Sequence, residues 1–203
     1  MTGSLSDFEH LAAQCRDSLT GVPGGARSPD AWLFARLVAA REVRGERALL
    51  GLSAATLGAL AARHFAASGG ALAAPQHEAL LVLDEAHAAF VAAMRDFLVG
   101  LAAPEVDADD ARCLATILAH ACLRPDHLWR DLGLSGRDDV TQMLTRFFPE
   151  LVVRNTDNLR WKKLLARELA LSVGGVPGPA PGCPGCEDFG FCFPGGKAAV
   201  QGS

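Results

Sequence analysis

The chain contains no tyrosine, and aromatic residues make up only 6% of its 203 residues. β-Branched residues are scarce, whereas alanine and leucine dominate a sequence that is 50% hydrophobic. Strands favour β-branched and aromatic side chains, and helices favour alanine and leucine. A chain of this length is also long enough for one well-buried core and short for two. The composition therefore predicts an all-α fold, a single helical domain of about six to eight helices.

Sequence patterns typical of several enzyme classes are missing as well. The chain has no glycine-rich phosphate loop, no nucleophile elbow and no HExxH zinc-binding helix. Its carboxylates are scattered and stand mostly near predicted helix starts, so no general acid/base pair can be identified. We therefore expect a protein that is not an enzyme.

Neither a nucleic-acid partner nor a membrane anchor is predicted. The net charge of −4 lacks the basic excess with which proteins neutralise phosphates. The longest uncharged apolar run, Ala48 to Ala62, is shorter than the roughly 20 residues that span a bilayer. The first residues carry acids and lack the basic-then-apolar order of a secretory signal. We expect a cytoplasmic protein whose cysteines meet a reducing environment.

Apolar residues recur at intervals of three and four through most of the chain, which is the spacing of amphipathic helices. Capping residues mark several helix starts, most clearly Ser28 followed by Pro29. The predicted helices run from Ser6 to Leu19, from Pro29 to near Gly45, from Ser53 to His64, from Pro75 to Leu101, from Asp107 through Ala121, through Val140 and Phe147, and from Asp157 to about Gly174.

An irregular segment follows these helices. Between Gly174 and Gly185, nine of twelve residues are glycine or proline, so neither a helix nor a strand interior is expected there. This change in composition predicts a helical domain over residues 1–173 and a cysteine-containing metal-binding loop and tail over residues 174–203.

Three cysteines stand close together in this loop, namely Cys183, Cys186 and Cys192. Two intervening residues let a tight loop turn both sulfurs of a C-x2-C pair toward one soft metal centre, and the third cysteine adds a further ligand. A zinc ribbon needs four ligands, whereas a cubane cluster with one open corner needs only three thiolates. An iron-sulfur or mixed-metal cluster, a zinc site, and redox or unligated thiols all remain compatible with this spacing.

Other candidate ligands are fewer. His127, at a predicted helix start beside Trp129, is the best histidine for an additional ligand from outside the loop. Cys113 and Cys122 fall on opposite faces of one predicted helix and Cys15 lies on an apolar stripe, so we interpret all three chiefly as small core residues. A basic cluster that includes Arg160, Lys162 and Lys163 precedes the loop. It could attract an oxyanion or an acidic surface of a partner protein. The same residues, with Leu132-Gly-Leu-Ser135, also allow a helical DNA-binding or adaptor protein with structural zinc.

The C-terminal half resembles a known family. His127-Leu-Trp-Arg-Asp-Leu-Gly-Leu134, then Phe148-Pro149, Asn155, Arg160-Trp-Lys-Lys163 and a cysteine cluster ending in Cys192-Phe193 together are similar to the NifQ family of nitrogen-fixation proteins. The family's cysteine pattern is C-x4-C-x2-C-x5-C, and the three loop cysteines match its last three positions. The first position falls on Gly178, which is a departure from the pattern.

The resemblance implies an iron-sulfur protein that takes up molybdenum and holds it in a mixed molybdenum-iron-sulfur cluster. It would donate the molybdenum to the assembly of the nitrogenase iron-molybdenum cofactor. The partners that the resemblance implies are the cofactor scaffold complex and the nitrogenase iron protein. Because Gly178 replaces a family cysteine, His127 or Cys122 becomes a candidate for the missing ligand.

Overall fold

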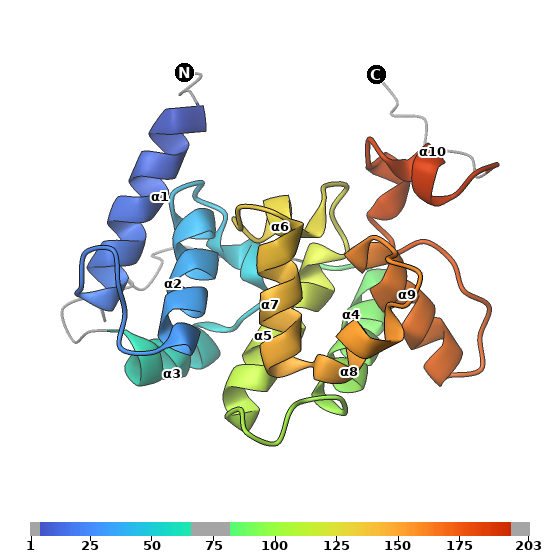
Figure 1. The fold of residues 1–203 in the computed structure, drawn as a ribbon, viewed down its shortest axis with the longest axis horizontal. Helices are drawn as coiled ribbons and strands as arrows, with labels where there is room; N and C mark the ends of the chain where they lie inside the picture. The colour runs from blue at the N-terminus through green and yellow to red at the C-terminus, as the bar shows by residue number, and fades with distance from the viewer. Residues whose placement is uncertain (1–4, 66–81, 196–203) are drawn as a thin grey trace. The chain divides into compact units, whose positions relative to one another are not determined.

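The computed structural model describes residues 5–65 and 82–195, and all regular elements in these ranges are helices (Figure 1). The predicted all-α fold is therefore confirmed. Seven of the α-helices in the described ranges have 11 to 16 residues, and three have only four to six. The chain divides into two compact units, residues 1–82 and residues 83–203, which we describe separately.

The first unit is organised around α2. This helix contacts each of the other helical elements of the unit, and its start is capped by Ser28, whose Oγ accepts a hydrogen bond from Ala31 N at 3.1 Å. Apolar side chains that are at most 1% exposed, among them Phe34, Leu37 and Leu60, form its interior. The elements are α1 (Leu5–Thr20), α2 (Pro29–Glu42), the 3-10 helix η1 (Arg47–Leu50) and α3 (Ala54–His64).

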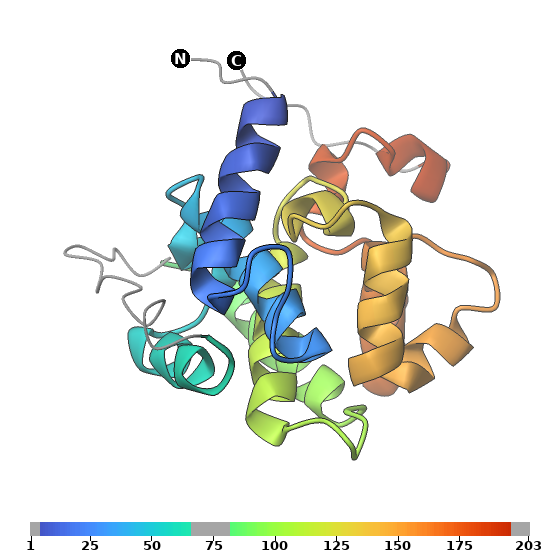
Figure 2. The ribbon, with the colours of Figure 1, turned by 60° about the vertical axis from the view of Figure 1, so that its left-hand side comes forward.

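The second unit contains the remaining helices. Its most extensive contact joins α4 to α5, and α9 also packs on α4 (Figure 2). Side chains such as Met94, Leu118, Phe147 and Leu164 are fully buried and form the core. The elements are α4 (Glu85–Val99), α5 (Ala108–Ala121), α6 (Leu128–Asp131), α7 (Arg137–Phe147), α8 (Pro149–Arg154), α9 (Trp161–Ser172), the 3-10 helix η2 (Cys183–Gly185) and α10 (Phe189–Cys192).

Two predicted helix starts differ from the structure. The helix predicted from Pro75 begins at Glu85, where the Asp84 carboxylate accepts the N–H of His87 at 2.8 Å, while Pro75 itself lies outside the described residues. The last long helix begins at Trp161 rather than at Asp157. The preceding residues form a turn in which Asn158 has a left-handed φ of 52°, a conformation that asparagine tolerates better than most residues.

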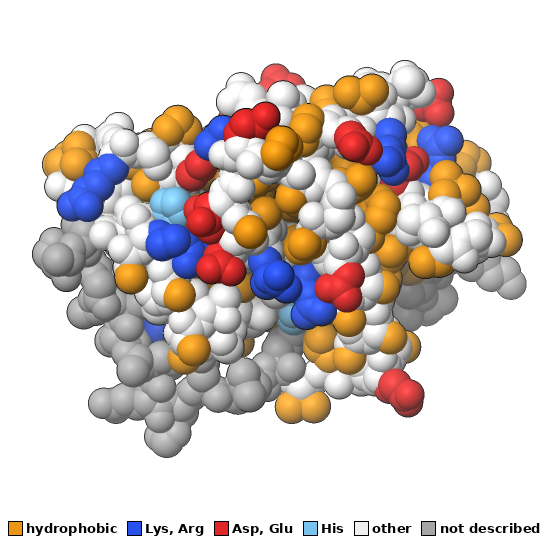
Figure 3. All heavy atoms as spheres, turned by 90° about the horizontal axis from the view of Figure 1, so that it is seen from below, with side chains coloured by type: hydrophobic (Ala, Val, Ile, Leu, Met, Phe, Trp, Pro, Cys, Tyr) orange, Lys and Arg blue, Asp and Glu red, His pale blue; other side chains and the backbone are white. Residues whose placement is uncertain are grey.

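The surface carries no broad area of one charge in the view of Figure 3. Acidic and basic side chains are interspersed on the described part of this face, with single apolar side chains between them. Within residues 5–65 and 82–195, no helix combines the length and the apolar character that crossing a bilayer requires.

The start of α5 provides a test of these local interactions. One carboxylate oxygen of Asp107 accepts hydrogen bonds from Asp109 N at 2.9 Å and Asp110 N at 3.0 Å. Replacing Asp107 by Ala should lower the free energy of unfolding by about 1 kcal/mol, because two N–H groups lose their acceptor. Chemical denaturation measures this change. The exposed neighbour Glu105, replaced by Ala, should behave as wild type, and equal midpoints for both variants would contradict the cap.

Candidate metal centre

The cysteine loop is anchored to the turn that follows α5. After α9 the chain turns and runs back toward the N-terminal end of α9 (Figure 1). Gly182 N then donates to Cys122 O at 2.9 Å. A Cβ atom on Gly182 would lie 2.0 Å from Arg124 O, and one on Gly185 would lie 2.8 Å from the Pro125 Cβ. Glycine is therefore required at both positions by close approach, and the loop includes two short helical turns, η2 and α10.

The turn itself is held by a buried ion-pair network. Lys162, only 6% exposed, lies at the start of α9 and donates to Arg124 O at 2.9 Å and also to Asp126 O. Its ammonium forms an ion pair with the buried Asp131 carboxylate of α6, which also accepts from Arg124 Nε at 2.9 Å. One lysine thus joins α9 and α6 to the backbone against which Gly182 packs.

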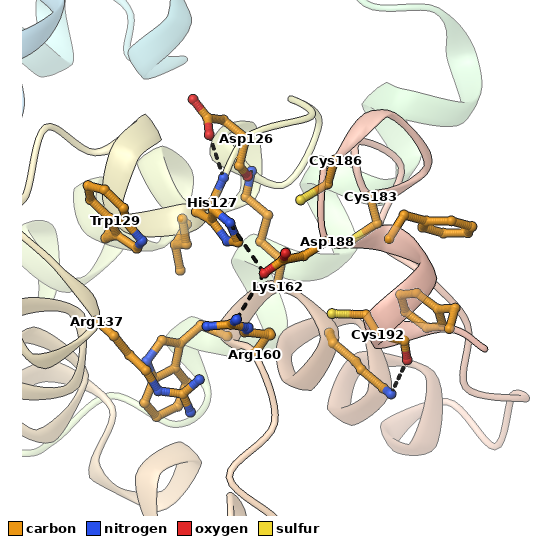
Figure 4. Close-up of a pocket in the computed structure, with 15 residues that line it drawn as sticks. Asp126, His127, Trp129, Arg137, Arg160, Lys162, Cys183, Cys186, Asp188 and Cys192 are labelled. Atoms are coloured by element: carbon orange, nitrogen blue, oxygen red, sulfur yellow. Dashed lines mark hydrogen bonds and ion pairs between the residues drawn. The ribbon is translucent and has the colours of Figure 1, made fainter. Parts of the chain in front are cut away.

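A pocket with a volume of about 50 Å³ opens beside this anchor (Figure 4). All three loop cysteines line it. Cys183 is buried, and Cys186 and Cys192 are half-buried. The other predicted site residues, His127, Arg160, Lys162 and Lys163, also line this pocket. The structure therefore brings together residues that are as far apart in the sequence as 127 and 192.

His127 lies opposite an acidic pair on the loop. Its Nε2 atom is 3.2 Å from Glu187 Oε1 and 3.5 Å from Asp188 Oδ2, and its ring stacks on Trp129 with centroids 6.3 Å apart. The Asp188 carboxylate lies between His127 and Arg160, whose Nη2 is 2.9 Å from Asp188 Oδ2 (Figure 4). As a ligand, His127 would have to exchange these carboxylates for a metal.

The basic residues have different roles in the fold. The ammonium of Lys162 makes all of its hydrogen bonds within the buried network, so it is not accessible to a docking partner. Lys163 donates to Cys192 O and lies 4.9 Å from the centre of the Phe193 ring, so it holds the end of the loop. Arg160 has a side chain that is 44% exposed, and it is the residue of the three that an approaching anion or protein surface can reach.

The thiols respond to burial and to the neighbouring cations. Burial raises the pKa of the Cys183 thiol, against the smaller opposing effects of the Ala180 backbone hydrogen bond and the Lys162 charge. Burial also raises the pKa of Cys192, while Lys163 and Arg160 oppose it. Without a metal these two groups are therefore neutral thiols at pH 7. Cys122 is fully buried, its pKa is raised to about 12 by burial, and it is absent from the lining of the pocket.

The donor set suits a soft metal, but it is not arranged around one ion. In the described part of the chain, no three His, Cys, Asp or Glu side chains are close enough together to hold a single ion. A tetrahedral zinc site requires four ligands around one ion. In a polynuclear cluster the thiolates bind different metal atoms, so their sulfurs need not converge on one point. The ligand role of the three cysteines remains a prediction, and their common pocket is compatible with a cluster.

Several residues of the site were not predicted from the sequence. Arg137 and Trp161 line the pocket, and Asp131 supplies the counter-charge for Lys162. Glu187 and Asp188 could have been found, because they stand between Cys186 and Cys192 in the sequence. Asp131 gave no such signal, since its partner is 31 positions away.

Comparisons with known proteins agree with the resemblance in the sequence. The family model described as NifQ matches residues 32–194. The "Protein NifQ homolog" of Sinorhizobium fredii is 43% identical over 83 residues, 41% of this chain and 36% of that protein. "Protein NifQ" of Azotobacter vinelandii is 44% identical over 80 residues, 39% of this chain and 41% of that protein.

A third relative, "Protein NifQ" of Klebsiella pneumoniae, is 40% identical over 85 residues, 41% of this chain and 51% of that protein. The chain thus spans about half or less of the length of these relatives. No solved structure matches this chain.

The close approach at Gly182 can be tested with a matched glycine of the same loop. The φ of Gly182 is −80°, which suits any residue, so only the lack of space for a side chain restricts this position. Replacing Gly182 by Ala should lower the free energy of unfolding by about 1–3 kcal/mol, because the loop must move away from Arg124 O. At Gly178 nothing lies within 4 Å of an added Cβ, so the same change there should cost less than about 0.5 kcal/mol. Denaturation curves that rank the two variants in the opposite order would contradict the anchor.

The buried network predicts a larger effect. Replacing Lys162 by Met should destabilise the protein by about 3 kcal/mol, because Asp131 loses one of its two cationic partners and two backbone carbonyls lose a donor inside the protein. Replacing Lys163 by Met should cost about 1 kcal/mol, since that ammonium donates to one carbonyl. Chemical denaturation measures the free energy of unfolding of both variants. Equal losses for the two variants would contradict the role of Lys162 in the buried network.

Proposed function

Because this chain belongs to the NifQ family, we propose that it is a carrier that acquires molybdenum and donates it to the assembly of the nitrogenase iron-molybdenum cofactor. The observation that supports the proposal is the convergence of Cys183, Cys186 and Cys192 on one pocket, on a loop that is anchored at one end. We propose a carrier rather than an enzyme, since release of a bound metal needs ligand exchange and no acid/base step.

Three thiolates would hold the metal in this proposal. Thiolates are soft ligands that suit iron-sulfur clusters, and three of them leave one metal corner of a cubane open to molybdenum or to a fourth iron. The neighbouring cations of Lys163 and Arg160 favour the thiolate form of Cys192 once a metal displaces its proton. His127, beside the loop, is the candidate for an additional ligand because the family's first cysteine position is Gly178 in this chain.

The two ends of the loop are attached with different strength. At the base, Gly182 is packed against a turn that the buried Lys162 holds. At the tip, Glu187 and Asp188 have side chains that are 64% and 31% exposed, and they make ion pairs. The turn that follows them is held by the buried Phe189 and by the bond from Lys163 to Cys192 O. Exposed ion pairs contribute about 0–1 kcal/mol each. The contacts of Glu187 and Asp188 are therefore weaker than those of the base, which suits a site that must release its cargo.

The proposed partners follow from the family alone. The cofactor scaffold complex and the nitrogenase iron protein are the expected recipients or helpers of the carrier, and molybdate is the expected source of the metal. The exposed tip, with Cys186 and Cys192 half-buried, is the part of the pocket that a recipient would approach.

Anaerobic reconstitution with iron, sulfide and molybdate tests the proposal. The wild-type protein should become brown and retain all three components, whereas Cys186→Ser should retain little or none, because one of the three thiolates is lost. Metal and sulfide analysis with visible absorption measures the loading. Far-UV circular dichroism should show nearly unchanged helix content in the variant, since the loop lies outside the helical core.

Cys15 provides the matched control, because it is a half-buried cysteine of α1 outside the pocket. Cys15→Ser should load as the wild type does. Equal loading of both variants, or a wild type that stays colourless and metal-free, would refute the carrier site. Loss of the whole fold in Cys186→Ser would favour a structural metal instead.

A further inference from the structure

The N-terminal end of α9 lines the pocket. Arg160 is the N-cap residue, and the three residues that follow it all contribute to the lining. In the described chain, no side chain caps this end of the 12-residue helix. The first N–H groups of a helix have no partner within it, and the helix dipole makes this end attractive to anions.

A buried donor beside this end also lacks a partner. Trp161 is only 6% exposed, and its Nε1 atom has no hydrogen-bond partner among the described residues. Indole N–H is a donor without acceptor capacity, and it usually finds an acceptor when it is buried. Because Trp161 lines the pocket, an oxygen atom bound there would supply the acceptor that this N–H lacks.

Arg137 adds a cation whose hydrogen-bond donors are only partly used within the fold. Its hydrogen bonds all use Nη2, which contacts Asn158 Oδ1 at 2.7 Å, Leu159 O at 2.8 Å and Asn158 O at 3.3 Å. In the described part of the chain its Nε and Nη1 groups have no partner, and no carboxylate pairs with it. The guanidinium lies 5.5 Å from the centre of the Trp161 ring. The left-handed turn at Asn158 therefore fixes Arg137 beside the indole.

Arg160 lies close enough to influence this cation. Burial, and then the charge of Arg160, lower the pKa of Arg137, although an arginine remains charged at pH 7. Four of the lining side chains are Lys or Arg and two are Asp, so the pocket has an excess of positive charge. Lys162 uses its three donors within the fold, whereas Arg137 and Arg160 each make their hydrogen bonds in the described chain through Nη2 alone. Figure 4 shows both arginines on the side of the pocket opposite Cys183.

We propose that Arg137, Arg160, the indole N–H of Trp161 and the first turn of α9 bind a tetrahedral oxyanion. We assign this anion as molybdate, an assignment that rests on the proposed function. The molybdate would be held beside the cysteines before its metal acquires sulfur ligands. The pocket volume of about 50 Å³ is several times the roughly 10–15 Å³ that one water molecule needs on the same measure. The arginines supply forked donors that match oxyanions.

Calorimetric titration of the metal-free, reduced full-length chain with molybdate, and with tungstate as its analogue, tests the site at low ionic strength. Both anions should bind to the wild type. Arg137→Gln should weaken binding about tenfold or more, because a charged donor pair is lost. Trp161→Phe should weaken it by a few fold while the aromatic ring under Arg137 is kept. Arg167→Gln is the matched control, because Arg167 belongs to the same helix but not to the pocket lining.

Unchanged affinity in Arg137→Gln, or no binding of either anion to the wild type, would overturn the oxyanion site. Circular dichroism verifies that each variant is folded, and Trp161→Phe remains as a second test if Arg137→Gln is not. Iron and sulfide loading separates this inference from the carrier proposal. Anion binding without cluster assembly would refute the carrier alone, and cluster assembly with unchanged molybdenum uptake in Arg137→Gln would refute the oxyanion site alone.

Discussion

The site depends on the buried ammonium of Lys162. This one group joins the start of α9 to the Asp131 carboxylate of α6 and to two backbone carbonyls of the turn after α5. A lysine is rarely buried to 6% exposure unless its charge is paired and its protons are hydrogen-bonded, and both conditions are met here. Because the network fixes the Arg124 backbone, it also fixes the surface on which Gly182 can dock.

A firm base and a weakly attached tip follow from this arrangement. Cys183 lies next to the docked glycine and is buried, whereas Cys186 and Cys192 are half-buried and flank the exposed Glu187 and the half-buried Asp188. The acidic residues Glu187 and Asp188 of the tip are attached by ion pairs with His127, Arg130 and Arg160. A docking partner with its own charges can compete with such pairs, because they are partly screened by water and salt. The proposed release of a metal would use this difference within one short loop.

Much of the architecture could be predicted from local patterns. The Ser28-Pro29 cap, the spacing of apolar residues and the change to glycine and proline at Gly174 each report on a few neighbouring residues, and the structure confirms the helices that they predict. The start of α9 was misplaced because Asp157 is a good cap in sequence terms, whereas the turn of Asn155 and Leu159 delays the helix. Residues 66–81 lie outside the part of the chain that the structure describes.

The site was predictable only in part. Cysteine spacing identified the loop, and the basic residues before it were recognised, but Lys162 was interpreted as a docking residue because its buried partner is distant in sequence. Arg137 belongs to a separate helix, and its free donors are defined only by the contacts that it makes with the turn at Asn158. Pairings between distant segments carry no local periodicity, so the structure was needed to find them.

In the proposed carrier, the three loop sulfurs hold molybdenum together with iron. X-ray absorption at the molybdenum edge, on the full-length protein after anaerobic reconstitution and desalting, tests it most directly. We expect sulfur and iron atoms as the neighbours of molybdenum. A spectrum with oxygen neighbours alone, or protein that retains no molybdenum, would contradict it.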